Sequence, residues 1–269
     1  MKNTLLALML VSSLFVISCG ADATKPTDAY KSQKTEISSG TKKVYDLQIN
    51  TSASPMDVST FALPGEKVTE ILEVSGDTGV DKAVVATKNP DGGIYQFTTT
   101  ATTTSTTGSV IYKYTKSAIA PIKEMTLNNI TVTSDTGSGT GSTATINDTT
   151  FQFLFEIVSV TYQGSDITTD IKSISGSKIS FYNPNLNGQI TIKYQYMDVY
   201  QISEKPTKEG AIETGDIITL TQNDAGKTYI CKDINMGTYY YGIVPANGII
   251  QSASLPGATQ NNNYQLWLY

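Results

Sequence analysis

Two cysteines, Cys19 and Cys231, have the most distinctive chemistry in this chain of 269 residues. Cys19 directly follows a short apolar run, in the order Phe-Val-Ile-Ser-Cys-Gly over positions 15–20. Cys231 lies in the strand-like segment 227–232, where a cysteine usually behaves as a small buried hydrophobe. We therefore expect Cys231 to be an inert buried thiol and Cys19 to be the cysteine with a function. A reactive or intermolecular Cys231 is the alternative.

The residues before Cys19 have the order of an export signal. Lys2 gives a positive start, an apolar stretch covers 5–17, and small residues flank Cys19. A positive n-region, an apolar h-region of about 7–15 residues and a small-residue cleavage site define a secretory signal. A spanning helix needs about 20 apolar residues, and Asp22 ends this run too early. We predict a cleaved signal peptide over 1–18, with a retained membrane anchor, plain secretion or a folded N-terminal helix as alternatives.

This signal resembles that of bacterial lipoproteins, over about the first 20 residues. Val16 and Ile17 stand where that family prefers Leu followed by a small residue, and Ser18 replaces the commoner Gly or Ala. The resemblance implies cleavage before Cys19 and a thioether-linked diacylglycerol on its sulfur. Each buried methylene contributes about 0.8 kcal/mol, so two or three acyl chains would hold the protein firmly. We expect a lipid-anchored protein of the bacterial cell envelope, in the outer membrane or at the cell surface, whose Cys231 has no disulfide partner.

The cationic residues restrict the chemistry of the rest of the chain. All 19 are lysines, and the sequence has no histidine and no arginine. Ser-His-Asp and Cys-His pairs are therefore excluded, as is a bidentate guanidinium clamp for phosphate or carboxylate. Carboxylates, lysine and tyrosine can still act in catalysis, and a nucleotide-composition bias would remove both residue types without functional meaning. We predict that the protein is not an enzyme and uses no cofactor; a carboxylate-dependent lipoprotein enzyme is the less favoured alternative.

The charge of the chain limits its partners. The formal net charge is −5 and the isoelectric point is near 4.8. An acidic exterior argues against nucleic acid and against electrostatic binding to anionic lipid. The expected partners are a membrane, through the lipid on Cys19, and a glycan or protein ligand.

The acidic residues are not arranged as a catalytic or metal-binding site. Glu66, Glu70 and Glu73 lie close in sequence, but strand alternation sends Glu66 and Glu70 to the face opposite Glu73, which leaves no paired-carboxylate site. The turns at 77–81 and 89–91 carry oxygen ligands that suit calcium, yet neither has the ligand count of an EF-hand loop. We expect these residues to cap turns and predict no metal site.

Three consecutive tyrosines, Tyr239, Tyr240 and Tyr241, are the best candidates for ligand contacts. In a strand, Tyr239 and Tyr241 share one face and Tyr240 takes the other, so at least one faces solvent if one face is core. Trp267 and Tyr269 are placed to join them. Aromatic rings with polar tips suit sugar or protein surfaces. Ordinary sheet packing with the tyrosine hydroxyls at the rim is the favoured interpretation, because tyrosine is enriched in strands.

The remaining pattern predicts an all-β body. Apolar and polar residues alternate in short segments separated by turn residues, and no helical period is convincing beyond the signal. Gly, Ser and Thr dominate 134–143, which is typical of a linker. We predict a lipidated flexible tether over 19–43, an N-terminal β domain over 44–133, a linker over 134–150 and a C-terminal β domain over 151–269, with a further division near 200–215 left open.

Segment 159–194 contains a Tyr-x-Gly-x-Asp-Ile turn, an Ile-Ser-Gly-x-x-Ile hairpin and an Asn-Gly-x-Ile-x-Ile return strand. These elements resemble small β-sandwich modules of bacterial surface proteins and phage tail proteins, which implies a fold rather than a function. We predict two Ig-like or β-sandwich-type units after the signal peptide and tether. The expected function is that of a lipid-anchored envelope surface protein with a structural or binding role. The alternative is a carbohydrate- or host-ligand-binding adhesin that uses the tyrosine-rich C-terminal sheet.

Overall fold

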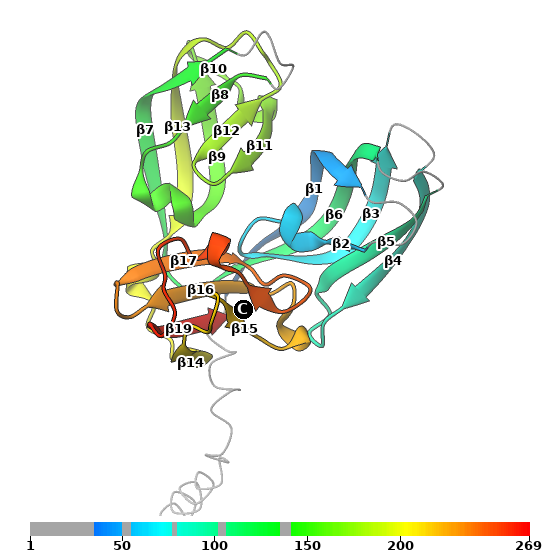
Figure 1. The fold of residues 1–269 in the computed structure, drawn as a ribbon. Coiled ribbons are helices and arrows are strands. Elements are labelled where there is room, and N and C mark those ends of the chain that lie inside the picture. The colour runs from blue at the N-terminus through cyan, green and yellow to red at the C-terminus, as the bar shows by residue number, and fades with distance from the viewer. Residues whose placement is uncertain (1–34, 50–54, 77–79, 102–105, 135–140) are drawn as a thin grey trace, which may run out of the picture. The chain divides into compact units, whose positions relative to one another are not determined.

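A computed structural model describes residues 35–49, 55–76, 80–101, 106–134 and 141–269 (Figure 1). In these ranges the regular elements are antiparallel β-strands and short 3-10 helices, which confirms the predicted all-β fold. The signal peptide, Cys19 and the first part of the predicted tether lie outside the described residues. No helix within the described ranges is long and apolar enough to cross a membrane.

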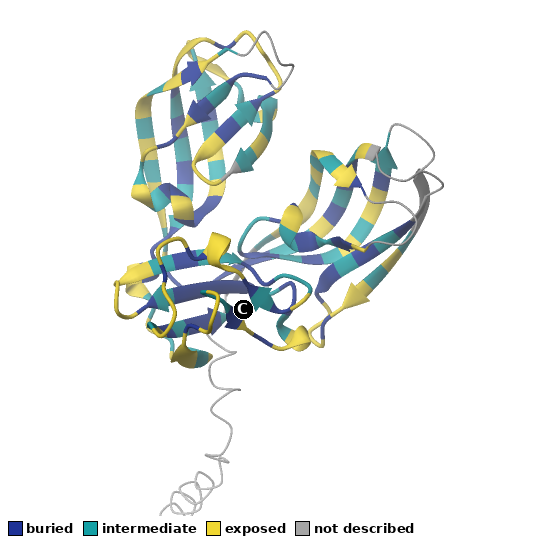
Figure 2. Ribbon diagram, in the orientation of Figure 1, coloured by how far each residue is buried: buried dark blue, intermediate teal, exposed yellow. Residues whose placement is uncertain are grey.

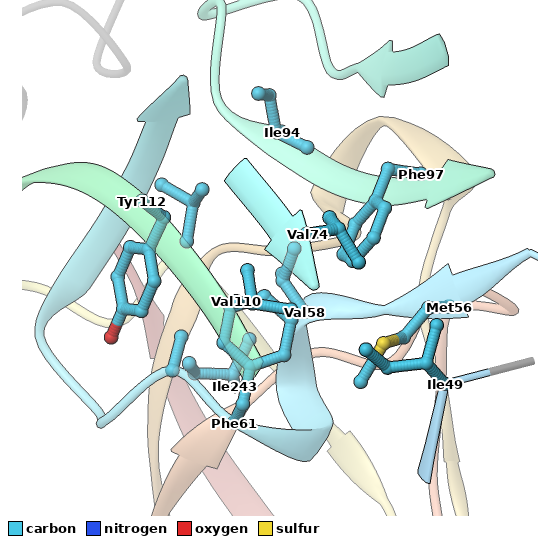
Figure 3. Close-up of a cluster of buried hydrophobic side chains, with 12 residues drawn as sticks. Ile49, Met56, Val58, Phe61, Val74, Ile94, Phe97, Val110, Tyr112 and Ile243 are labelled. Carbon is cyan, nitrogen blue, oxygen red and sulfur yellow. The ribbon is translucent and has the colours of Figure 1, made fainter. Parts of the chain in front are cut away.

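The first sandwich comprises the described residues between 35 and 118. It pairs a sheet of order β1-β6-β3 with a sheet of order β2-β5-β4. Apolar side chains from both sheets, among them Val110, Tyr112, Ile94 and Phe97, form one core in which each is at most 2% exposed (Figure 3). The strands are β1 (Thr35–Ile49), β2 (Met56–Asp57), β3 (Glu66–Gly76), β4 (Val80–Lys88), β5 (Ile94–Ala101) and β6 (Thr106–Ala118), with the 3-10 helix η1 (Val58–Thr60) after β2.

Strand β1 corrects the predicted tether, which was drawn as far as residue 43. The strand begins at Thr35 and pairs with β6 from Thr35↔Ala118 onward. An edge strand takes its hydrogen bonds from one neighbour and needs little apolar surface, so its polar sequence gave no hydrophobic period to detect. Residues 35–43 are therefore part of the first sandwich.

The seven-stranded sheet has the order β10-β9-β13-β7-β8-β12-β11 (Figure 1). Val160, Ile192 and Ile179, from β9, β13 and β12, belong to one buried core, so both ends of the sheet close over the same interior. Buried and half-buried residues alternate along β13 from residue 190 to residue 195, as its period of two requires (Figure 2). The elements are β7 (Ile122–Thr133), β8 (Thr143–Thr145), η2 (Thr149–Phe153), β9 (Leu154–Tyr162), β10 (Ser165–Asp166), η3 (Thr168–Asp170), β11 (Ile171–Ser175), β12 (Lys178–Phe181) and β13 (Gly188–Met197).

The sheet boundaries differ from the predicted domain boundaries. Strand β7, drawn in the N-terminal domain, pairs with β13 of the seven-stranded sheet. Strand β8 lies inside the predicted linker yet pairs with both β7 and β12. Glycine and serine in this segment indicate turns, but threonine also favours strands, and only partners distant in sequence decide between the two.

The C-terminal sheet has the order β14-β19-β16-β17, with a separate β15-β18 pair. Its first strand begins at Lys208, within the region near 200–215 where the sequence allows a further division. Cys231 in β16 is 0% exposed, and burial raises its pKa to about 12, so the predicted buried thiol is confirmed. The elements are η4 (Val199–Gln201), β14 (Lys208–Ala211), β15 (Ile218–Thr219), η5 (Gln222–Asp224), β16 (Thr228–Asp233), β17 (Thr238–Ile243), β18 (Ile249–Ile250), η6 (Ser252–Ser254) and β19 (Asn263–Leu268).

Residues from all three sheet groups meet in one further apolar cluster, which we call the junction cluster. It contains Ala118 at the end of β6, Phe155 in β9, Met197 at the end of β13, and Ile230 and Trp267 of the C-terminal sheet. Each of these is at most 6% exposed. Burial of apolar surface therefore stabilises the contacts between the sheets as well as each sheet separately.

Alanine substitutions at two glycines test whether Gly141 packs against the end of β12. Gly141 and Gly164 have φ of +85° and +83°, but a Cβ on Gly141 would fall on the carbonyl oxygen of Phe181, whereas nothing lies within 4 Å of one on Gly164. Left-handed backbone costs an alanine about 1–2 kcal/mol, and overpacking adds about 1–3 kcal/mol. In urea denaturation we expect Gly141→Ala to lower the free energy of unfolding by about 3 kcal/mol and Gly164→Ala by about 1 kcal/mol. Equal losses would mean that residue 141 is not packed against β12.

Candidate functional site

Two of the four predicted ligand contacts lie in the core. Tyr240 is 7% exposed and its hydroxyl donates to the carbonyl oxygen of Pro256 at 3.3 Å. Trp267 is 6% exposed in the junction cluster, and its Nε1 donates to the carbonyl oxygen of Glu204 at 2.9 Å. Both residues thus take part in sheet packing, the interpretation that strand propensity favours, rather than facing a ligand. The physical reason is that apolar residues cover both faces of β16, on which Ile230 and Cys231 are each 0% exposed.

The other two tyrosines share the opposite face of β17, as strand alternation predicted. Tyr241 packs against the junction cluster, with its hydroxyl 3.5 Å from that of Tyr269 and its ring centroid 6.4 Å from that of Phe153. Burial raises the pKa of Tyr241. Tyr239 lies two residues earlier in β17; it is also half-buried and also packs against the junction cluster. What distinguishes it from Tyr241 is its ring contact with the exposed Tyr200, which makes it the best placed of the four to meet a ligand.

Tyr239 begins a row of side chains across the C-terminal sheet, which we call the rim row. Strand pairing sets Lys232 opposite Tyr239, Gln265 opposite Lys232 and Glu209 opposite Gln265. Directly opposed residues in antiparallel strands project to the same face. Two side-chain contacts agree with this: Lys232 Nζ is 5.4 Å from the Tyr239 ring centroid, and Gln265 Nε2 donates to Glu209 Oε1 at 2.8 Å.

The rim row lies at the edge of the junction cluster, against which Tyr239 packs. The preceding row on the same face, Tyr241, Ile230 and Trp267, packs into the junction cluster. In the rim row, Tyr239, Lys232 and Gln265 are half-buried and Glu209 is exposed. The side chains are thus held by their neighbours yet open to solvent on one side.

A residue distant in sequence extends the rim row. Tyr200, in η4, is 67% exposed. Its ring meets that of Tyr239 edge to face, with centroids 5.0 Å apart and an interplanar angle of 70°. No sequence pattern marks Tyr200, because η4 and β17 come together only through the tertiary fold. Tyr200 and the rim row together present a pair of aromatic rings, followed by the ammonium of Lys232, the amide of Gln265 and the carboxylate of Glu209.

A second group of polar side chains, the buried ion cluster, lies between β3, β6 and β9. Glu66 Oε1 accepts from Lys42 Nζ at 2.6 Å, and Oε2 accepts from Tyr112 Oη at 2.7 Å. Lys116 Nζ lies 3.9 Å from Glu66 Oε1 and donates to the carbonyl oxygen of Phe155. The side chains of Glu66 and Lys116 are 0% and 3% exposed, so both charges are sheltered from water.

The burial of Glu66 corrects the predicted arrangement of the three glutamates. A register shift between Val68 and Glu70 interrupts the alternation of β3. Glu66 therefore points inward, whereas Glu70 points outward and pairs with Lys113 at 2.6 Å. A β-bulge inserts an extra residue into one strand and reverses the faces beyond it. The sequence pattern does not show where such a bulge falls.

The electrostatics of the buried ion cluster are dominated by desolvation. Burial lowers the pKa of Lys116 to about 8, against the opposing effect of Glu66. Burial and the neighbouring Glu66 raise the pKa of Tyr112. The Glu66 carboxylate also accepts from the backbone N–H of Leu63 at 3.0 Å. The Glu66 oxygens thus hold β1, β3 and β6 together. Shifted pKa values can mark a functional site, but in this cluster they accompany a structural role.

The turn at 89–91 behaves as predicted. The Asn89 and Asp91 side chains both accept from the backbone N–H of Gly93, and Asn89 Nδ2 donates to the carbonyl oxygen of Ala225 at 3.0 Å. These contacts cap the turn and tie it to the C-terminal part of the chain. The other calcium candidate starts at Asp77, which lies outside the described residues. Across the described ranges, no three His, Cys, Asp or Glu side chains are grouped to bind a metal ion.

Comparison with known proteins adds no family assignment to this geometry. No protein-family model matches the chain, and no curated protein matches its sequence.

The buried lysine predicts a pH-dependent stability. Its pKa is about 8 in the folded protein, while an unfolded lysine titrates near 10.4, so between these values the unfolded chain binds more protons. The contribution of Lys116 to the free energy of unfolding then rises with pH. We expect this contribution to rise by roughly 2 kcal/mol between about pH 8 and about pH 10. The buried Cys231 thiol opposes it over the same range, because burial raises its pKa and the unfolded thiol ionises first. Urea denaturation at a series of pH values measures it.

Lys116→Met should remove most of this rise. The matched control is Lys113→Met, on the same strand, because the Lys113 side chain is 50% exposed. The groups that act on the charge of Lys116 are Glu66, Lys42 and Glu156, and all remain in both variants. The pH dependence should therefore differ between the two variants, and equal effects of the two substitutions would contradict the assignment.

Proposed function

We propose that this chain is a lipid-anchored protein of the bacterial cell envelope, in the outer membrane or at the cell surface, with a structural or binding role. The observation that carries the proposal is Cys19, which follows a positive start and an apolar run and stands between two small residues. Cys231 supports it, because a free and fully buried thiol is not available for a disulfide with Cys19. The acyl chains on Cys19 would make the membrane the first partner.

The body of the protein suits a display role. Its described part is built from antiparallel sheets with a junction cluster between them. A carboxylate-dependent enzyme is the less favoured proposal, since Glu66 is engaged by Lys42, Tyr112 and a backbone N–H. A body of this kind holds surface residues in fixed positions, which a binding or structural protein requires.

An adhesin is the second candidate, and one observation favours it. Tyr239 remains at the rim of the C-terminal sheet beside the exposed ring of Tyr200. The binding surface would then be the rim row, and not the set of three tyrosines and Trp267 that the sequence predicts. Aromatic rings presented in this way suit a sugar or protein surface.

Metabolic labelling with a fatty acid tests the anchor. We expect the full chain, expressed in a bacterium with a lipoprotein pathway, to incorporate label and to fractionate with membranes, because the sulfur of Cys19 carries the diacylglycerol. Cys19→Ala should lose the label and leave the membrane fraction. Cys231→Ala is the matched control and should keep both. An unlabelled protein whose mature N-terminus, determined by mass spectrometry, is not Cys19 would refute the anchor.

A further inference from the structure

We propose that the rim row and Tyr200 form a binding site for an uncharged oligosaccharide. The proposal gives a ligand class to the binding role proposed above, and it does not depend on the lipid anchor. It assigns Tyr200 as an aromatic platform and Lys232, Gln265 and Glu209 as the hydrogen-bonding groups.

The site is extended and fixed in shape. The four positions of the rim row lie on four neighbouring strands. Strands are about 4.8 Å apart, so the rim row is roughly 14 Å long. Such a line suits a chain of several sugar rings better than a single ring. Each backbone position is set by sheet hydrogen bonds, which limits the ordering entropy that binding must overcome.

The aromatic end offers a flat apolar surface with a fixed orientation. Tyr200 is 67% exposed, and its edge-to-face contact with Tyr239 holds its ring in place. Lys232 lies over the ring of Tyr239 at 5.4 Å, so Tyr239 supports the platform and Tyr200 remains open. Tyrosine supplies a large contact area with few rotatable bonds, together with a hydroxyl that donates and accepts. These properties match a sugar ring, which has an apolar face and a polar edge.

The polar end alternates donors and acceptors. The Lys232 ammonium donates, the Gln265 amide can do both, and the Glu209 carboxylate accepts. Sugar hydroxyls also donate and accept, so neighbouring hydroxyls can bridge successive groups of the rim row. The 2.8 Å hydrogen bond from Gln265 to Glu209 fixes which end of the amide faces the carboxylate.

The charges of the rim row favour an uncharged ligand. Lys232 and Glu209 are its two charged residues, and their charges cancel. The whole chain carries a formal net charge of −5, which disfavours acidic polysaccharides at long range. A protein partner would need about 800 Å² of contact with an apolar centre, whereas three of the five residues here are polar or charged. A neutral oligosaccharide is therefore the ligand that the side chains fit best.

The test uses the Cys19→Ala chain, so that its outcome is independent of lipidation. Binding is measured by calorimetry with maltohexaose, cellohexaose, mannohexaose and chitohexaose, and with an acidic hexasaccharide of galacturonate. We expect at least one neutral hexasaccharide to bind, with an affinity that does not change between low and high salt. Tyr200→Ala and Gln265→Ala should each weaken it at least about tenfold, or 1.4 kcal/mol.

The control is Tyr182→Ala. Tyr182 is also exposed and also lies edge to face with a tyrosine, Tyr45, at 5.5 Å, but outside the rim row. It should leave affinity unchanged, and thermal melts should show all three variants folded. Met236→Ala tests an apolar alternative, because Met236 is 61% exposed on the turn between β16 and β17. No binding to any neutral sugar, binding only to galacturonate, or loss of binding with Met236→Ala but not with Gln265→Ala would each overturn the proposal.

Discussion

The rest of the structure depends on the burial of the Lys116 ammonium near the end of β6. An ion removed from water needs partners in every direction, since an unpaired buried charge is strongly destabilising. Glu66 of β3 supplies the opposite charge, and Phe155 of β9 supplies both a carbonyl oxygen and a ring 4.4 Å from the ammonium. These partners belong to different sheets. Burial of one lysine therefore requires β3, β6 and β9 to keep their positions together.

Other hydrogen bonds reinforce the same arrangement from the C-terminal side. Gly65, next to Glu66, donates its N–H to Thr228 Oγ1 at 2.7 Å, and Asp57 accepts from the N–H of Ala246 at 2.6 Å. Thr228 begins β16, the strand whose Ile230 enters the junction cluster. The cluster covers one part of the C-terminal sheet and reaches Tyr239, the cross-strand neighbour of the half-buried Lys232. The open rim row and the closed junction are thus two consequences of one packing arrangement.

Local features of the fold could be predicted from the sequence, and features that depend on distant partners could not. The alternation of Tyr239, Tyr240 and Tyr241 and the turn at Asn89 follow from geometry within a few residues. The bulge after Val68, which turns Glu66 inward, follows from the register with β6. The same reason explains why the meeting of Tyr200 with Tyr239 was missed. A site built from cross-strand neighbours has no signature along a single segment.

The composition of the chain gives the junction one further property. Every cation is a lysine, so the buried charge near the end of β6 is one that can be lost. An arginine at this position would stay charged at any pH the protein meets, whereas burial lowers the pKa of Lys116 to about 8. Deprotonation would remove the charge that opposes burial and leave an amine that can still donate to Phe155. The absence of arginine, which first served to exclude functions, therefore also makes the contact between the sheets responsive to pH.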